Sequence, residues 1–358
     1  MPVRRTVLTS SANDDKTSEI PLLSLSGDDD YENHSDDSHD DDDNHSPGDQ
    51  SRVNLKRTLG IRSSVSCIVG IIIGSGIFLS PQGVILYCHS PGLSLIVWVL
   101  CGVYALLGAM CYAELGTTYA ASGGAYTYLM AMFGEMPAFL LLWSYFIVRI
   151  PTGNCLSALI FAKYVLQDVF TCVSPPDSAV RIVAFLVIVI VVLLNCVSIK
   201  LTTRVIEVCT YSKVLALVII IISGIVMLFK GNVDNFQEPF RNSATSPGQV
   251  ALGFYAGIYS YAGWDSLNSI TEELKDPHRT LPVSLGISMC LVTVIYVLTN
   301  LAYLTVLTPT EILLSSAVAV SYGGKILAAA TWCIPVLVAV SVFGGVNAGF
   351  LMASSFYR

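Results

Sequence analysis

Charged side chains are scarce in this sequence, and in one long stretch they are missing altogether. Only 13% of the 358 residues are Asp, Glu, Lys or Arg, whereas 53% are hydrophobic, and no charged residue occurs between Ser63 and Ala113. A membrane-spanning helix needs about 20 apolar residues in succession. The sequence therefore argues against a soluble fold and predicts an all-α polytopic membrane protein. We expect eight spans, at residues 64–88, 92–114, 126–167, 180–199, 205–229, 249–272, 282–307 and 324–355.

The motifs of common catalytic classes are also absent. The spans contain no His-Glu-Xaa-Xaa-His zinc motif, no Gly-Xaa-Ser-Xaa-Gly elbow and no phosphate-binding loop. No carbonyl-filter sequence or ring of charges typical of an ion channel is evident. We therefore do not expect an enzyme, and we predict no cofactor, no metal and no nucleic-acid partner. The polar, acidic N-terminus also lacks a cleavable signal peptide, so the first span is expected to direct membrane insertion.

The acidic residues gather at the N-terminal end. Residues 1–50 hold 14 acidic and 3 basic side chains, a net charge of −11, which leaves 12 acidic and 16 basic side chains, a net charge of +4, in a chain whose total is −7. Runs of aspartate repel themselves and offer nothing to bury. We therefore predict a disordered acidic tail at residues 1–50 and a transmembrane domain at residues 51–358.

Basic residues concentrate on one side of the predicted membrane. Lysine and arginine near span ends favour the cytoplasm, and Arg52, Lys56, Arg57 and Arg62 precede the first span. Counting alternate sides from there gives nine basic residues inside and four outside. This asymmetry predicts a cytoplasmic N-terminus, so that the two glycosylation sequons of the tail, which begin at Asn33 and Asn44, are expected to be silent.

Small residues interrupt two of the expected spans. Gly74-Ser75-Gly76 lies in the first span, and Ala262-Gly263 follows Tyr259-Ser260-Tyr261 in the sixth. Unwound backbone at membrane depth survives only where protein or a water-filled cavity covers it. Broken spans at corresponding positions of two halves point to the binding site of a transporter. Spans one and six suit a five-helix repeat followed by its inverted copy.

Several motifs resemble one transporter family. The sequence is similar to the light chains of heteromeric amino acid transporters, of the amino acid–polyamine–organocation superfamily, from about Val53 to Ser355. The stretch from Tyr259 to Leu307 resembles the y+L type, with the L-type branch close behind. The motifs are Gly74-Ser75-Gly76-Ile77-Phe78 with Ser80-Pro81, Cys111-Tyr112-Ala113-Glu114-Leu115-Gly116-Thr117, and Thr271-Glu272-Glu273 with Pro277 and Pro282.

The resemblance implies a LeuT-like inverted-repeat fold, a plasma-membrane location and obligatory exchange of large neutral or cationic L-amino acids. Family members have twelve spans, so the eight expected here correspond to a first repeat at residues 60–230 and a partial second repeat at 248–358. We therefore expect a chain that is C-terminally truncated relative to the family. Two functions follow: an exchanger whose full form has twelve spans, or a non-transporting membrane subunit that binds the heavy chain and modulates the full-length transporter.

The resemblance also implies a site for the two charges of an amino acid. The substrate carboxylate meets backbone amides at the first break, here Ser75, Gly76 and Ile77. The substrate amino group meets carbonyl groups at both breaks, here Ile72 with Tyr259, Ser260 and Ala262. Free N–H groups at a helix N-terminus attract a carboxylate, and unwound carbonyl groups attract an ammonium group. The family places an aromatic gate at Tyr259, although this ring could instead only pack in a helix interface.

Two charged residues near the breaks have more than one interpretation. Lys213, at the start of the fifth span, is a functional candidate because a lysine inside a span is costly. The resemblance makes it a fixed cation that replaces a structural sodium ion and ties the first span to the eighth; the alternative is a snorkelling lysine. Asp265 either pairs with a basic substrate side chain or is a helix-terminal acid bonded to protein donors.

Cys172 is the candidate for a link to a second protein. It lies in a short segment predicted to be extracellular, where the surroundings are oxidising. In the family a cysteine at this place forms a disulfide with a single-pass type II glycoprotein, the heavy chain. The alternatives are a free thiol and a bond to Cys88.

Two residues depart from the family pattern. Ile71 stands where the y+L type carries a polar residue, which weakens the interpretation of a cationic substrate. Arg149, which precedes Ile150-Pro151, is shifted by one position, and a buried arginine needs a partner that the sequence does not identify.

Overall fold

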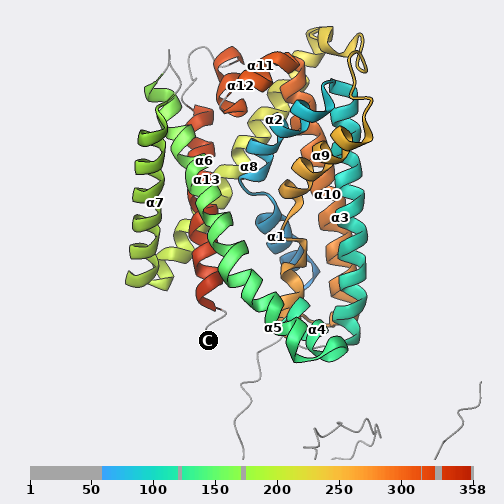
Figure 1. The fold of residues 1–358 in the computed structure, drawn as a ribbon, viewed down its shortest axis with the longest axis vertical. Coiled ribbons are helices and arrows are strands. Elements are labelled where there is room, and N and C mark those ends of the chain that lie inside the picture. Colours follow the sequence, from blue (N-terminus) through green and yellow to red (C-terminus); the bar gives the residue numbers. More distant parts are fainter. Residues whose placement is uncertain (1–58, 120–122, 171–174, 316, 327–332, 356–358) are drawn as a thin grey trace, which may run out of the picture. The chain divides into compact units, whose positions relative to one another are not determined.

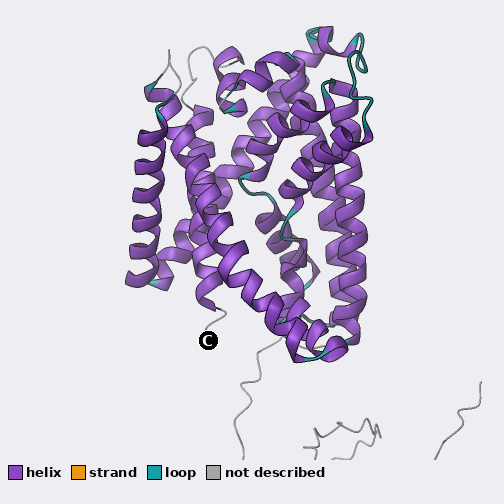
Figure 2. Ribbon diagram, in the orientation of Figure 1, coloured by secondary structure: helices purple, strands orange, loops and turns teal. Residues whose placement is uncertain are grey.

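The computed structural model describes the chain except residues 1–58, 120–122, 171–174, 316, 327–332 and 356–358 (Figure 1). The described residues are mostly helical and include no strand, apart from an isolated bridge between Leu59 and Leu274 (Figure 2). This agrees with the predicted all-α class. The acidic tail predicted at residues 1–50 lies outside the described residues.

The first half of the described chain runs through α1 (Ile61–Ile72), α2 (Gly76–Cys88), α3 (Pro91–Thr118), α4 (Ala125–Phe133), α5 (Glu135–Ser144), the π-helix η1 (Tyr145–Arg149), α6 (Ile150–Val169), α7 (Asp177–Val197) and α8 (Ile199–Phe229). The second half runs through the 3-10 helix η2 (Asp234–Phe236), α9 (Pro247–Ile258), the 3-10 helices η3 (Tyr259–Tyr261) and η4 (Trp264–Glu273), α10 (Pro277–Val306), α11 (Pro309–Leu314), α12 (Val318–Ile326) and α13 (Cys333–Ser355).

Most membrane-length helices match the predicted spans. Within the described residues, six helices are long and apolar enough to cross a membrane, and the bent pair α1–α2 makes a seventh. The sixth predicted span, residues 249–272, is not a continuous α-helix, because α9 ends at Ile258 and the chain continues as η3 and η4. The polytopic membrane class is therefore confirmed, with the sixth span taking a broken form.

One predicted span has a wrong boundary. The third, at residues 126–167, is divided at Gly134, whose φ of 86° separates α4 from α5. Glycine adopts this positive φ without the clash that a Cβ atom would bring. The eighth, at residues 324–355, contains α13 from Cys333 onward, and residues 327–332 lie outside the described residues. A hydropathy window as long as a span averages over the boundary at Gly134, because long apolar runs flank it on both sides.

Large apolar side chains cover the outer face of α7. Ile182, Phe185 and Leu193 are 61%, 66% and 59% exposed. In water such a face would be costly, whereas lipid is as apolar as the side chains themselves. The exposed faces therefore fit a protein whose surroundings are the hydrocarbon of a bilayer.

The helices pack as two groups, one of which contains α1. In one group α10 packs on α3 and α1, and α2 packs on α9. In the other, α13 packs on α6, α7 and α8, around a small apolar core that includes Ala158, Ala184 and Val346. Figure 1 shows α7, α6 and α13 on one side of the view and α3 and α10 on the other. The breaks of α1–α2 and α9–η4 therefore belong to the group that contains α3 and α10.

An ion pair outside the spans fixes α11 beside α12. Thr308 and Glu311 form a capping box at the start of α11, and the Lys325 Nζ atom lies 2.6 Å from a Glu311 carboxylate oxygen. Hydrogen bonds from Lys325 and from the backbone of Thr308 lower the pKa of Glu311 to about 2. Glu311 and Lys325 therefore form an exposed pair of opposite charges, remote in sequence from both breaks.

Candidate functional site

Both interruptions predicted from small residues are present as breaks in helices. The first break, Ile73 to Ser75, joins α1 to α2 with a bend of 53°. In the second, Ala262 is extended and Gly263 has a φ of 106°, between η3 and η4. These residues leave helical backbone groups without partners inside their own helices.

The two breaks touch each other through their backbones. A Cβ atom on Gly76 would lie 2.7 Å from the Cα atom of Ser260, and one on Gly263 would lie 2.8 Å from the side chain of Ile71. Real Cβ contacts are longer than this, so any side chain would push the breaks apart. Glycine at these two positions therefore permits the close approach.

The carbonyl end of α1 receives donors from two other helices. The last carbonyl groups of a helix have no partner within it. Ile73 N–H donates to the Val69 carbonyl over 3.0 Å, the Lys213 ammonium group donates to the Gly70 carbonyl, and the Tyr296 hydroxyl lies 2.9 Å from the Ile72 carbonyl. Lys213 is in α8 and Tyr296 is in α10, so both helix groups hold this helix end.

Tyr296 is a site residue that the sequence analysis missed. Its hydroxyl also lies 2.9 Å from the Ser260 carbonyl, in the second break. A hydroxyl has one proton, so it donates to one of the two carbonyl groups at a time. The ring is fully buried and packs edge-on against Trp98 and Tyr261. A tyrosine inside the apolar span 282–307 was the only sequence signal for it.

The carbonyl groups expected to bind an amino group are thus partly engaged within the protein. Ile72 and Ser260 share the Tyr296 proton, and the Tyr259 carbonyl accepts from Ala262 N–H over 3.3 Å. Each carbonyl oxygen has a second lone pair. The cluster therefore keeps acceptor capacity for an ammonium group.

The N–H end of α2 lies on the opposite side of the same break. Ser75, Gly76 and Ile77 are buried, and Phe78 N–H donates to the Ser75 carbonyl over 3.2 Å. In the described part of the chain, the N–H groups of Gly76 and Ile77 have no backbone acceptor. A helix N-terminus with free N–H groups favours an anion.

Tyr259 stands next to the first break. Its side chain is 36% exposed and interacts with the hydroxyl groups of Ser75 and Ser157, which are 3.4 Å from each other. Ser157 comes from α6, in the other helix group. Tyr259, the aromatic residue expected as a gate, therefore links the second break to the first break and to α6. Ser157 is a further site residue that the sequence did not indicate.

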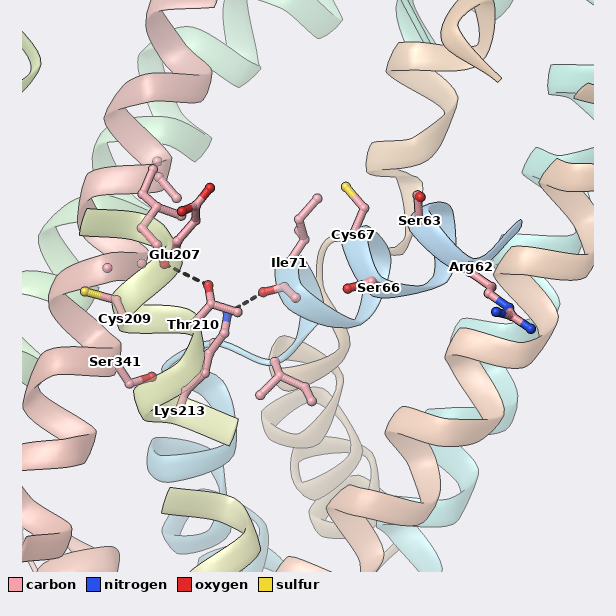
Figure 3. A pocket seen from close by; sticks show the side chains of 18 residues that line it. Arg62, Ser63, Ser66, Cys67, Ile71, Glu207, Cys209, Thr210, Lys213 and Ser341 are labelled. Atoms are coloured by element: carbon pink, nitrogen blue, oxygen red, sulfur yellow. Dashed lines mark hydrogen bonds between the residues drawn. The ribbon is translucent and has the colours of Figure 1, made fainter. Parts of the chain in front are cut away.

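Lys213 lies at the wall of a large cavity. The cavity, of about 930 Å³, is bounded by α1, α8 and α13. Figure 3 shows the Lys213 side chain reaching from α8 towards α1, beside Thr210, with Ser341 of α13 to its left. The bond to Gly70 joins it to the first span, and Ser341 of the eighth span lines the same cavity.

Asp265 and Arg149 form an ion pair. The Arg149 Nη1 atom lies 3.6 Å from the Asp265 Oδ2 atom, and the two side chains are 54% and 31% exposed. Arg149 closes the π-helix η1, and its guanidinium carbon lies 5.1 Å from the Tyr145 ring centre. A π-turn holds one residue more than an α-turn, so η1 changes the direction in which Arg149 leaves the helix. The partner that the sequence did not identify is thus Asp265.

The cysteine expected to bond a second protein is not among the described residues. Cys172 falls in the segment 171–174, which lies outside them. Cys88, its alternative partner, is a fully buried free thiol beside Gly253 of α9.

Together these features define a class of protein. Two broken helices meet inside a helical membrane protein and present carbonyl groups from one helix end and N–H groups from the other. Broken helices of this kind form the substrate sites of many membrane transporters. The chain belongs to the amino acid permease family, whose model matches residues 59–358.

Curated relatives agree with this assignment. The chain is 45% identical over 294 residues to the b(0,+)-type amino acid transporter 1 of Mus musculus, covering 82% of this chain and 60% of the relative. It is 46% identical over 312 residues to the large neutral amino acids transporter small subunit 2 of Homo sapiens, covering 85% and 57%. It is 41% identical over 315 residues to the Homo sapiens cystine/glutamate transporter, covering 88% and 63%. The chain thus spans about three fifths of the length of these relatives.

Proposed function

We propose that this chain binds and transports L-amino acids as a plasma-membrane exchanger of large neutral or cationic substrates. The observation that carries the proposal is the contact between the two breaks. It sets the N–H end of α2 beside the carbonyl end of α1 and the Ser260 carbonyl. An α-amino acid carries a carboxylate and an ammonium group on one carbon, so this pair of helix ends matches both charges. The names of these relatives, all amino acid transporters, support the same substrate class.

Exchange is tested with the purified chain in liposomes. We expect uptake of labelled leucine into vesicles loaded with unlabelled leucine and little uptake into empty vesicles, because an obligatory exchanger returns to the outside only with a bound substrate. Equal uptake into loaded and empty vesicles would contradict exchange. Binding of the heavy chain with no leucine uptake into either would instead support the non-transporting subunit.

We also propose that Cys172 forms a disulfide with a single-pass glycoprotein heavy chain. In cells that make such a partner, Cys172→Ser is expected to abolish the heavier species seen on non-reducing electrophoresis. Cys290→Ser is the matched control, because Cys290 is an exposed thiol on the membrane-spanning helix α10. A heavier species that persists in Cys172→Ser would exclude this cysteine.

A further inference from the structure

We propose that the Arg149–Asp265 ion pair makes the side-chain end of the site electrically neutral and thereby selects amino acids with uncharged side chains. This inference rests on the proposed function and narrows its substrate class. Three features of the structure carry it: a cavity beside the second break, the ion pair in its wall, and the π-helix η1 that contains Arg149.

The cavity lies against the second break and the end of α1 that precedes the first break. It has a volume of about 280 Å³, and its walls include Ile71 at the end of α1 and Ala262 and Gly263 of the second break. Leu141 and Leu142 of α5 add apolar surface. An amino acid whose backbone charges are held at the breaks has its side chain within reach of this space. The cavity is therefore a compartment for the substrate side chain.

Two oppositely charged residues line this compartment and neutralise each other. Among the residues that the structure describes, Arg149 and Asp265 are the only Arg, Lys, Asp or Glu in its wall, and their charged atoms are 3.6 Å apart. This separation is longer than a charge-assisted hydrogen bond of about 2.7–2.9 Å. The pair is thus an electrostatic contact with no net charge.

A charged substrate side chain gains little from such a pair. A lysine or arginine side chain attracted to Asp265 also meets the like charge of Arg149, and a carboxylate attracted to Arg149 meets Asp265. Attraction and repulsion at similar distances largely cancel. An apolar side chain has no charge to interact with the pair, and its transfer from water into the cavity is favourable in free energy. The intact pair therefore favours substrates such as leucine over glutamate or arginine.

The π-helix η1 determines which way Arg149 points. The extra residue of η1 rotates the following chain relative to an α-helix, and the Tyr145 ring packs beneath the guanidinium group of Arg149. Such a cation–π contact holds the arginine in place. The distortion thus gives Arg149 a fixed position opposite Asp265.

The test is a charge-swap series in the full chain, reconstituted in lipid nanodiscs. Labelled leucine is displaced by unlabelled leucine, glutamate or arginine. Asp265→Asn leaves Arg149 unpaired, and we expect glutamate to compete about tenfold better relative to leucine. Arg149→Gln leaves Asp265 unpaired, and we expect arginine to compete about tenfold better. The double variant Arg149→Gln/Asp265→Asn restores neutrality and is expected to return to the leucine preference of the unchanged chain.

Two control variants change the same charges elsewhere. Glu311→Gln and Lys325→Gln each break the exposed pair between α11 and α12, and neither is expected to change the competition ratios. Unchanged ratios in both site variants, or a shift in the same direction in both, would overturn the inference. If a single variant loses leucine binding, recovery in the double variant supports neutral pairing and loss in the double variant overturns it. Absence of leucine binding to the unchanged chain would instead refute the proposed function, and the inference with it.

Discussion

Replacing Gly76 with alanine is expected to weaken leucine binding by roughly 10- to 100-fold, because an added methyl group that overpacks a tight contact costs about 1–3 kcal/mol. The new Cβ atom would lie 2.7 Å from the Cα atom of Ser260. Because backbone on both sides forms the contact, no side chain can rotate away to relieve it. The two breaks must separate, and the helix ends then no longer match the spacing of one amino acid. Leucine affinity of the purified variant measures the effect.

Gly74→Ala is the matched control for Gly76→Ala. Gly74 is in the same break, yet its added Cβ atom would meet only the Ile72 carbonyl oxygen, at 3.8 Å. This is an ordinary van der Waals contact, so a much smaller loss of leucine affinity is expected. Equal losses in the two variants would show that flexibility of the break, and not the Gly76–Ser260 contact, matters.

Replacing Lys213 with methionine is expected to reduce leucine exchange by roughly 10-fold or more, since a carbonyl group left without its charged donor costs about 1–3 kcal/mol. Methionine keeps much of the apolar stem but loses the donor to Gly70 and the positive charge at the carbonyl end of α1. Because Lys213 belongs to α8, its replacement removes the hydrogen bond that joins α1 to the group of α6, α8 and α13. Exchange rate and leucine affinity are measured separately, and the rate is expected to fall more than the affinity.

Lys230→Met is the control for Lys213→Met. Lys230 follows the C-terminal end of the same helix and is exposed, so its replacement removes the same chemical group without touching α1. Exchange is expected to remain at the level of the unchanged chain. An undiminished rate in Lys213→Met would remove the proposed tie between α1 and α8.

Local features of the sequence were sufficient to predict the helical spans and both breaks. A span is a property of about 20 consecutive residues, and the glycines of Gly74-Ser75-Gly76 and Gly263 weaken a helix wherever they occur. The boundary at Gly134 escaped this reasoning. Long apolar runs flank Gly134-Glu135 on both sides, so a hydropathy window as long as a span averages over the boundary.

The partners of the site residues were not predictable in this way. Tyr296 is 224 residues from Ile72 along the chain, and the Asp265 carboxylate meets an arginine from another span. The residues next to either partner in the sequence do not indicate which residue it contacts. Arg149 stands one position away from its place in the family pattern, which gave no direction for its side chain.

By itself, the sequence determined that this protein spans a membrane as helices, that two of those helices are interrupted, and that its motifs belong with amino acid transporters. These conclusions follow from composition and from short runs of residues, which act locally on the backbone. Only the tertiary structure decided that the interruptions touch at Gly76 and Ser260, that Tyr296 and Lys213 hold the end of α1, and that Asp265 is paired with Arg149. Such contacts depend on how helices far apart in the chain pack together, and packing brings into reach side chains whose separation in the sequence carries no information about their distance in space.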